Sequence, residues 1–436
     1  MYPLRGSKMD DANSFYWWGQ KVGKTPSGPP RLVKRRSMET PFSAVALSSA
    51  EREDFRTRFE KRLEKVKAKT AEVFAFKEVE QPPFIVNSAL YTTFGLDPET
   101  FPDRYYDDPQ AMIDLQERNY YEQLKEIDDD FVPYLMPWFG TAVTASALGC
   151  QVDFPPKLDP TMNPRHYPVR TPADVKKLQI ADPEKDGLMP RVVQFLRAMR
   201  ANSFLPVGIT DFQGPLTTAN QLMGYDKLIY LMQDYPAAMH ELMDKVTETL
   251  IRWVKKQKEV IGEPLTDCFS DQQVYVGGHA GIWFSDDDAV LMSPETYKEF
   301  VVPYNSRILR TFGGGCLHYC GNATHQAENF LATEGLRAIN NYTLYDLQGF
   351  RALKSKLEGR VVLFACDFTP VEYQDYFREL LEGLSLKGLV IDSQFTPLVA
   401  LLKGGKYVQV QRPLTPGKKN VSEFLCRYFQ DRKQAQ

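Results

Sequence analysis

The sequence predicts an α/β fold, a single (β/α)8 TIM barrel with an N-terminal extension. Short apolar runs alternate with amphipathic stretches of helix length, which is typical of a parallel sheet covered by helices. About eight such units follow one another, and at that number closure into a barrel is favoured over an open sheet. The chain of 436 residues, 43% of them hydrophobic, is long enough for a barrel with insertions and a large core.

The N-terminal extension is expected to form an arm followed by a helix. Residues 1–48 are predicted as an irregular arm, because the aromatic residues 15–18 lie among Gly, Pro, Ser and basic residues without a sustained period. Such an arm would pack on the main body or on a second copy of the chain, in a homodimer; disorder is the alternative for its first dozen residues. Residues 49–436 are predicted as the barrel with its N-terminal helices. Ser48 and Glu51 form a capping-box pattern that begins a long charged helix.

The strands are predicted from apolar runs bounded by polar residues. They comprise residues 83–87, 131–136, 205–211, 316–320, 336–340, 361–366 and 407–411. Residues 266–285 are expected to form a loop. Ser293, Pro294 and Glu295 then begin a helix that extends to about residue 308, with a capping serine, a proline in the first turn and an acid near the positive end of the helix dipole.

Net charge, apolar runs and cysteine spacing indicate which partners and which compartment to expect. A formal charge of −3 gives no electrostatic reason to expect binding to nucleic acid or to an anionic membrane. No apolar run approaches the ~20 residues that span a bilayer, and the N-terminus lacks the apolar segment of a secretory signal. The six cysteines show no disulfide-framework spacing, so we expect reduced thiols and a cytoplasmic protein.

Polar residues at the ends of the predicted strands indicate a site for a small molecule. In a barrel of this kind the active site lies at the carboxyl ends of the strands. Asp211 and Asp367 are therefore candidate catalytic residues. The candidate substrate-binding residues are Asn87, Gln213, Asn340 and His279, the last within a glycine-rich loop. For each residue taken alone, a capped or solvated strand end is the alternative, and for His279 it is simple surface exposure.

A metal site is predicted from the alternation of Cys316, His318 and Cys320. Strand side chains repeat with a period of two, so these three leave one face of the strand. His318 and Cys320 offer the nitrogen and sulfur ligands that Zn²⁺ prefers, and Cys366, at the end of another strand, could complete a triad. Three protein ligands and an open position describe a catalytic zinc. Such a metal holds a thiol as its thiolate, ready to attack an alkyl group.

Other interpretations remain open at the sequence level. Buried free cysteine is a common core residue, and Cys316 is expected to be one. The three consecutive acids 286–288 are usually a solvated turn, but one of them could serve as a general acid or a fourth zinc ligand. The chain has no phosphate-binding loop, no dinucleotide-binding glycine motif and no serine nucleophile elbow.

Several segments together resemble the uroporphyrinogen decarboxylase superfamily. They are Asp129-Asp-Phe-Val-Pro-Tyr-Leu, Gln213-Gly-Pro-Leu-Thr-Thr-Ala, the Ser-Pro-Glu helix from Leu291 to Tyr304, and Leu317-His-Tyr-Cys-Gly-Asn. The resemblance covers residues 80–415 and implies a (β/α)8 barrel. The chain is more similar to the zinc- and corrinoid-dependent methyltransferases of the superfamily than to its true decarboxylases. The latter carry arginines after the first strand, where this chain has Asn87-Ser-Ala-Leu-Tyr-Thr-Thr.

This resemblance implies a zinc-dependent methyltransferase. Its His-x-Cys pair and distant cysteine correspond to His318, Cys320 and Cys366, although no cysteine stands in the Gly-Cys-Gly context of the best-known thiol methyltransferases. No Asp-x-His-x-x-Gly segment is present, so a methylcobamide would be carried by a separate corrinoid protein. The substrate would be a thiol, a methoxy compound or a methylamine. The alternatives are a metal-free decarboxylase or lyase in which Asp211 stabilises a cationic ring, and a non-catalytic barrel that binds a cofactor or partner.

Overall fold

The computed structural model describes residues 46–88, 104–155, 159–163, 165–395, 398–403, 406–411 and 415–435, together with two short N-terminal strands. These are β1 (Ser14–Trp17) and β2 (Gln20–Lys24), which pair antiparallel. The rest of the predicted N-terminal arm before residue 46 lies outside the described residues. The helix predicted after Ser48 is α1 (Ser49–Phe74), and both hydrogen bonds of the capping box are present.

A six-stranded parallel sheet forms the centre of the molecule, in the order β3-β12-β11-β10-β9-β8. Its strands are β3 (Phe84–Ser88), β8 (Ile282–Ser285), β9 (Gly315–Cys320), β10 (Leu336–Tyr342), β11 (Val362–Phe368) and β12 (Leu389–Phe395).

Two further extended segments continue this sheet on both sides. Residues 131–136 and 207–213 are joined by a parallel bridge between Leu135 and Val207, and Gln213 bridges to Ser285 of β8. At the other edge, Asp130 N–H donates to the Phe84 carbonyl of β3, at 2.8 Å. Backbone hydrogen bonds thus connect eight extended segments in a ring. The predicted α/β barrel fold is confirmed.

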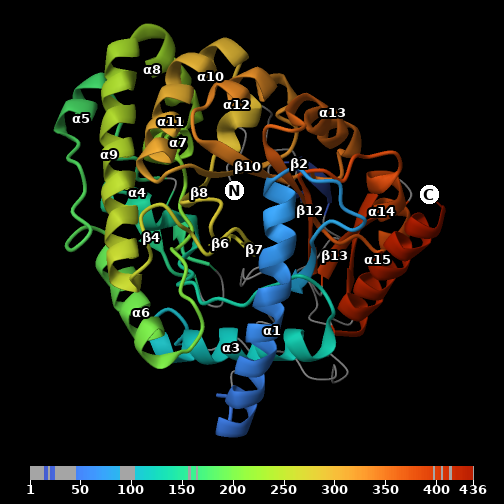
Figure 1. The fold of residues 1–436 in the computed structure, drawn as a ribbon. Helices are drawn as coiled ribbons and strands as arrows, with labels where there is room; N and C mark the ends of the chain where they lie inside the picture. The colour runs from blue at the N-terminus through green and yellow to red at the C-terminus, as the bar shows by residue number, and fades with distance from the viewer. Residues whose placement is uncertain are drawn as a thin grey trace.

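Helices surround the sheet on the outside, as Figure 1 shows. Between β3 and β8 they are α3 (Pro109–Glu126), α4 (Val143–Ala147), α5 (Pro172–Lys177), α6 (Met189–Asn202), α7 (Pro215–Met223), α8 (Tyr225–Asp234) and α9 (Pro236–Ile261). After β8 they are α10 (Pro294–Phe300), α11 (Val302–Thr311), α12 (Ala327–Ala332), α13 (Leu347–Leu357), α14 (Tyr373–Leu381) and α15 (Thr415–Ala435). The short antiparallel pair β4 (Val152–Asp153) and β5 (Thr161–Met162) lies between α4 and α5.

The loop assignment was wrong, one predicted strand lies outside the barrel sheet, and one barrel strand was missed. Residues 266–285 are not only loop, since they contain β8 and the short hairpin of β6 (Ser270–Asp271) and β7 (Val274–Tyr275). Residues 407–411 belong to β14 (Lys406–Gln411), which pairs with β13 (Leu398–Lys403) outside the barrel sheet. The last barrel strand is β12, which pairs with both β11 and β3 and closes one side of the ring.

The helix predicted from Ser293 is interrupted. Ser293 caps α10 as expected, its hydroxyl accepting from the Thr296 N–H. The chain then leaves the helical conformation at Val301, with φ −125° and ψ −50°, and α11 begins at Val302. Pro303 explains the break, because its ring removes one helical hydrogen bond and clashes with the preceding turn.

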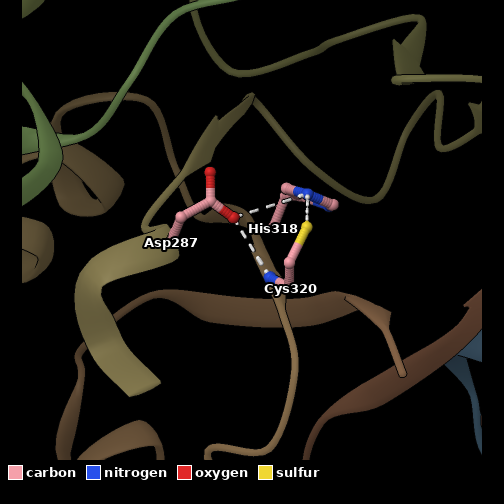
Figure 2. Close-up of side chains that lie close together, drawn as sticks. All are labelled: Asp287, His318 and Cys320. Atoms are coloured by element: carbon pink, nitrogen blue, oxygen red, sulfur yellow. Dashed lines mark hydrogen bonds and ion pairs between the residues drawn. The ribbon is translucent and has the colours of Figure 1, made fainter. Parts of the chain in front are cut away.

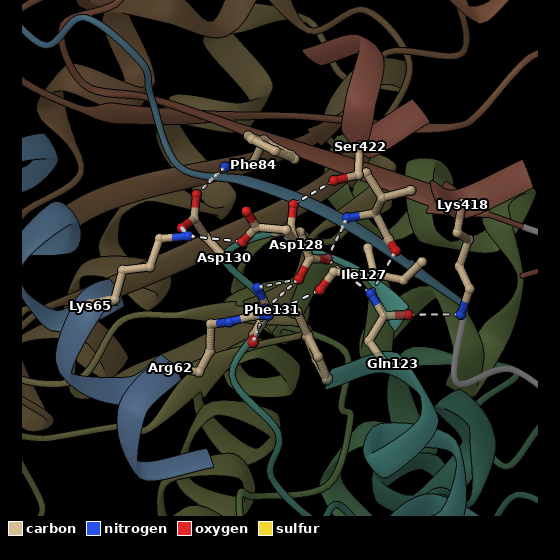
Figure 3. Close-up of polar contacts among 12 residues, drawn as sticks. Arg62, Lys65, Phe84, Gln123, Ile127, Asp128, Asp130, Phe131, Lys418 and Ser422 are labelled. Carbon is tan, nitrogen blue, oxygen red and sulfur yellow. Dashed lines mark hydrogen bonds and ion pairs between the residues drawn. The ribbon is translucent and has the colours of Figure 1, made fainter. Parts of the chain in front are cut away.

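Buried polar contacts fasten α1, α3 and α15 to the amino-terminal end of the barrel (Figure 3). Arg62 of α1 pairs with Asp129 at 2.6 Å, and Asp129 also accepts from the Val86 N–H of β3, at 3.0 Å. Gln123 of α3 donates to Asp129 at 2.9 Å and accepts from Lys418 of α15 at 2.7 Å. The first and last helices are therefore held by one hydrogen-bonded group.

The core of the barrel is continuous with the packing of the helices around it. Phe55, Phe59 and Val66 of α1 are buried, as the helical spacing predicts.

Within the described residues, no helix combines the length and apolar character that a membrane crossing requires.

Candidate metal centre

Three consecutive acids follow β8, and their neighbours turn them in different directions. Asp286 accepts hydrogen bonds from Tyr297 at 2.6 Å and Asn305 at 2.9 Å, which ties it to α10 and α11. Asp288 accepts from Asn220 of α7 at 2.8 Å. Both outer carboxylates are thus held by surrounding helices. The middle residue, Asp287, is left to face β9.

Asp287 meets His318 and Cys320 at the carboxyl end of β9 (Figure 2). The His318 Nε2 atom lies 3.6 Å from the Cys320 Sγ atom and 3.8 Å from the Asp287 Oδ1 atom. The backbone N–H of Cys320 also donates to Asp287 Oδ1, at 3.1 Å. One oxygen, one nitrogen and one sulfur ligand atom therefore lie within 4.8 Å of one another.

Burial keeps the two β9 donors uncharged. It lowers the pKa of His318, against the opposing effects of the Asp287 charge and of a hydrogen bond to Asn340. It raises the pKa of the Cys320 thiol well above its ordinary value, and the nearby Asp287 charge acts in the same direction. At neutral pH the centre therefore presents a neutral imidazole and a protonated thiol.

Asn340 of β10 orients the imidazole. Its Oδ1 atom lies 3.3 Å from His318 Nδ1, so the Nδ1–H donates to the amide oxygen. This places the lone pair on Nε2, the atom that faces Cys320 and Asp287. Asn340 was predicted as a substrate-binding residue, and its side chain contacts the histidine.

Cys366 lies apart from this group. Cys320 of β9 and Cys366 of β11 both align with Tyr342 of β10, which lies between them. Their Cα atoms are therefore about 10 Å apart, twice the ~4.8 Å spacing of neighbouring strands. The Cys366 thiol instead donates to Asp392 of β12, at 3.3 Å. The sequence predicted Cys366 as the third metal ligand. In this conformation Asp287 is the third residue of the group instead.

The two predicted catalytic acids are buried near the centre. Burial raises the pKa of Asp211 to about 8, and the negative charge of Asp287 adds to this rise. Burial raises the pKa of Asp367 to about 7, while Thr343 and Tyr376 donate hydrogen bonds to its carboxylate. Each acid lies at the carboxyl end of its strand.

The remaining predicted residues divide between the two ends of the barrel. Asn87 aligns with Gln394 at the carboxyl end of β3, and Gln213 bridges to Ser285 at the same end. His279 precedes β8 at the opposite end, where its ring stacks on Phe74 of α1 with centroids 4.7 Å apart. The structure does not bring His279 to the metal centre.

The donor set suits a transition metal such as zinc. Atoms bound to zinc at roughly 2.0–2.3 Å and tetrahedral angles lie about 3.3–3.8 Å apart. The separations of 3.6 Å and 3.8 Å from His318 Nε2 match this range before any side chain moves. A carboxylate, an imidazole and a thiolate also leave a fourth position open for water or substrate.

Comparison with known proteins shows which family this chain is similar to. Residues 67–262 match the family model of uroporphyrinogen decarboxylase (URO-D). This part of the chain, less than half of its length, is similar to that family. The matched residues include the strand ends with Asp211 and Gln213. Asp287, His318 and Cys320 lie beyond them.

The curated proteins that are similar to this chain include decarboxylases and a methyltransferase. The uroporphyrinogen decarboxylase of Carboxydothermus hydrogenoformans is 28% identical over 178 residues, which are 38% of this chain and 45% of that protein. The methylated-thiol–coenzyme M methyltransferase of Methanosarcina mazei is 25% identical over 196 residues, covering 43% of this chain and 47% of that protein. The chain thus matches less than half the length of these curated relatives.

A solved structure extends the comparison to most of the fold. A methyltransferase from Methanosarcina mazei superposes with a TM-score of 0.60, covering 84% of this chain and 99% of that chain at 15% sequence identity. This similarity shows the fold. The predicted resemblance to the superfamily is confirmed, and the similar proteins include a methyltransferase besides the decarboxylases.

Proposed function

We propose that this protein is a zinc-dependent methyltransferase, which exchanges a methyl group between a small substrate and a corrinoid carried by a separate protein. The observation that carries the proposal is the convergence of Asp287, His318 and Cys320 at the carboxyl end of β9. In barrels of this kind that end holds the active site. The methyltransferase relatives support the reaction class.

Each protein group has a defined part in this proposal. His318 Nε2, Cys320 Sγ and Asp287 Oδ1 would hold the metal, and Asn340 would fix the imidazole tautomer. When bound, Zn²⁺ would hold the sulfur of an incoming thiol as thiolate at neutral pH. The Cys320 proton has to leave on metal binding, since only the thiolate is a metal ligand.

The buried acids would act on the substrate. Asp211, with its pKa raised to about 8, carries a proton at neutral pH and would donate a hydrogen bond to the group that releases or receives the methyl. Gln213 and Asp367 would orient the substrate from neighbouring strand ends. Cys366 would join these ligands only if its thiol left Asp392 and turned toward the metal.

The oxidation state of the cysteines bears on the cellular compartment. All six cysteines are free thiols in this structure, and Cys320 has to remain reduced to bind a metal. We therefore propose that the protein acts in the cytoplasm. The corrinoid protein would dock over the carboxyl end of the barrel, where the candidate centre lies.

A metal-free decarboxylase is the second candidate. Uroporphyrinogen decarboxylases are among the relatives, and Asp211 is a buried acid at the mouth of the barrel that could stabilise a cationic ring. The absence of arginine in residues 87–93 argues against a substrate with many carboxylates, since these would lack counter-charges.

Metal content separates the two candidates. Protein purified without chelator should contain close to one zinc per chain, and His318→Ala and Cys320→Ser should lose it while keeping the wild-type circular dichroism spectrum. The matched control is His325→Ala, because His325 contacts the Met292 carbonyl and lies outside the three-residue group. Zinc-loaded protein should then demethylate methylcobalamin in the presence of a thiol. A wild-type protein without metal, or variants that retain it, would shift the assignment to the decarboxylase.

A further inference from the structure

The residue before the candidate metal-binding acid is fixed to β9 through its main chain. The Asp286 N–H donates to the carbonyl of His318, at 2.7 Å. The next residue, Asp287, accepts from the Cys320 N–H at 3.1 Å. Two successive residues after β8 therefore bond to the main chain of the two β9 residues that offer metal ligands. A displacement of Asp286 would carry the Asp287 carboxylate away from both of them.

The Asp286 carboxylate is in turn held by donors from two helices. Its Oδ2 atom accepts from the Tyr297 hydroxyl of α10 at 2.6 Å and from Asn305 Nδ2 of α11 at 2.9 Å. Asn305 Nδ2 also lies 3.4 Å from the Tyr297 hydroxyl oxygen. All three side chains are buried. Because a buried carboxylate that loses its donors is costly, these two donors determine where Asp286 lies.

The break between α10 and α11 explains how both donors reach one carboxylate. Tyr297 and Asn305 are eight residues apart. In an uninterrupted α-helix they would be separated by about 12 Å along the axis, and since both side chains tilt toward the amino end, neither would close the gap. The chain leaves the helical conformation at Val301, and α11 begins at Val302. The interruption therefore brings the two donors together at Asp286.

We propose that Asp286 is the positioning residue of the metal centre, and that the interrupted helix holds it there through Tyr297 and Asn305. The two helices fix the main chain at Asp286, and this main chain fixes the Asp287 carboxylate against β9. The three positioning side chains act only through Asp287, and none of them would itself be a ligand. This inference deepens the proposed function and rests on it for the metal.

Removing both donors tests the inference through zinc affinity. The double variant Tyr297→Phe/Asn305→Leu should weaken zinc binding at least about ten-fold in competition with a coloured chelator, as expected for residues that support a metal ligand. Tyr304→Phe is the matched control, because the Tyr304 hydroxyl of α11 contacts His240 Nδ1 at 2.8 Å instead of Asp286. This control should change the zinc dissociation constant less than about three-fold. Tyr297→Phe alone is the second variant if the double variant does not fold, and it should weaken zinc binding more than the control does.

Cobalt(II) in place of zinc shows which ligand is displaced. A bound Cys320 thiolate gives a sulfur-to-cobalt charge-transfer band in the near ultraviolet, whereas the visible bands depend on the number and geometry of all ligands. The double variant should keep the ultraviolet band and change the visible bands, because Asp287 moves while Cys320 stays. Tyr304→Phe should give the wild-type spectrum. A loss of stability alone would not alter the spectrum of the folded protein.

Each outcome decides the inference. Wild-type zinc affinity in the double variant, a weakened affinity with an unchanged cobalt spectrum, or equal losses in Tyr304→Phe would overturn it and leave the proposed metal centre standing. Loss of the sulfur band in a folded double variant would also overturn it, because the effect would then reach beyond Asp287. A wild-type protein that binds neither zinc nor cobalt would overturn both proposals.

Discussion

Replacing Asp287 by asparagine tests the central geometric claim, that only the middle one of three consecutive acids serves the metal. Asparagine keeps the shape and one oxygen but removes the charge. Asp288→Asn is the matched control, since Asp288 is the neighbouring aspartate but accepts from Asn220 and lies outside the three-residue group.

The expected magnitude follows from the arrangement of the ligands. Loss of a partner that only supports a metal ligand weakens metal binding by about 10–100-fold, so loss of a direct ligand should weaken it at least as much. That corresponds to at least about 1.4–2.7 kcal/mol of zinc binding free energy. Asp288→Asn should change the zinc dissociation constant less than about three-fold, which is within 0.7 kcal/mol.

Competition with a coloured zinc chelator measures both dissociation constants, and a weakly buffered titration counts protons. The raised pKa of Cys320 means that its thiol must ionise, whereas His318, with its lowered pKa, is already neutral. Close to one proton should therefore leave per zinc at pH 7, and affinity should rise as pH rises. Wild-type affinity in Asp287→Asn, or binding without proton release, would refute the geometry.

Three further predictions concern the surroundings of the centre and the ends of the barrel. Asn340→Ala should weaken zinc binding by about 10–100-fold, because the His318 tautomer is no longer fixed; an unchanged dissociation constant in the chelator assay would contradict this. His279→Ala should keep the wild-type zinc content by elemental analysis, since the ring stacks on Phe74 at the other end of the barrel. Burial lowers the pKa of Lys418 from 10.5 to about 8, so the folded protein loses this proton before the unfolded chain does. The free energy of unfolding should therefore carry a contribution that rises by up to about 3 kcal/mol between pH 8 and 10.5. Lys418→Met should flatten that rise in urea titrations, and an identical pH profile in the variant would count against it.

The repeating pattern of the chain was enough to predict the barrel. Alternating apolar runs and helical stripes depend on local periodicity, which a single sequence displays. The capping box at Ser48 and the cap at Ser293 were predicted correctly, because a helix cap is also a local pattern of residues. The missed strands were β8, which is only four residues long, and β12, while the run at residues 407–411 has strand character but pairs outside the barrel sheet.

The sequence by itself determined that His318 and Cys320 leave the same face of one strand, because two residues are one full period of a strand. It offered three consecutive acids and a distant cysteine as further ligands without deciding among them. Only the tertiary structure did so, by holding Asp286 and Asp288 against helices and by placing β10 between Cys320 and Cys366. The physical reason is that distances between remote residues depend on strand register and packing, which no local pattern contains.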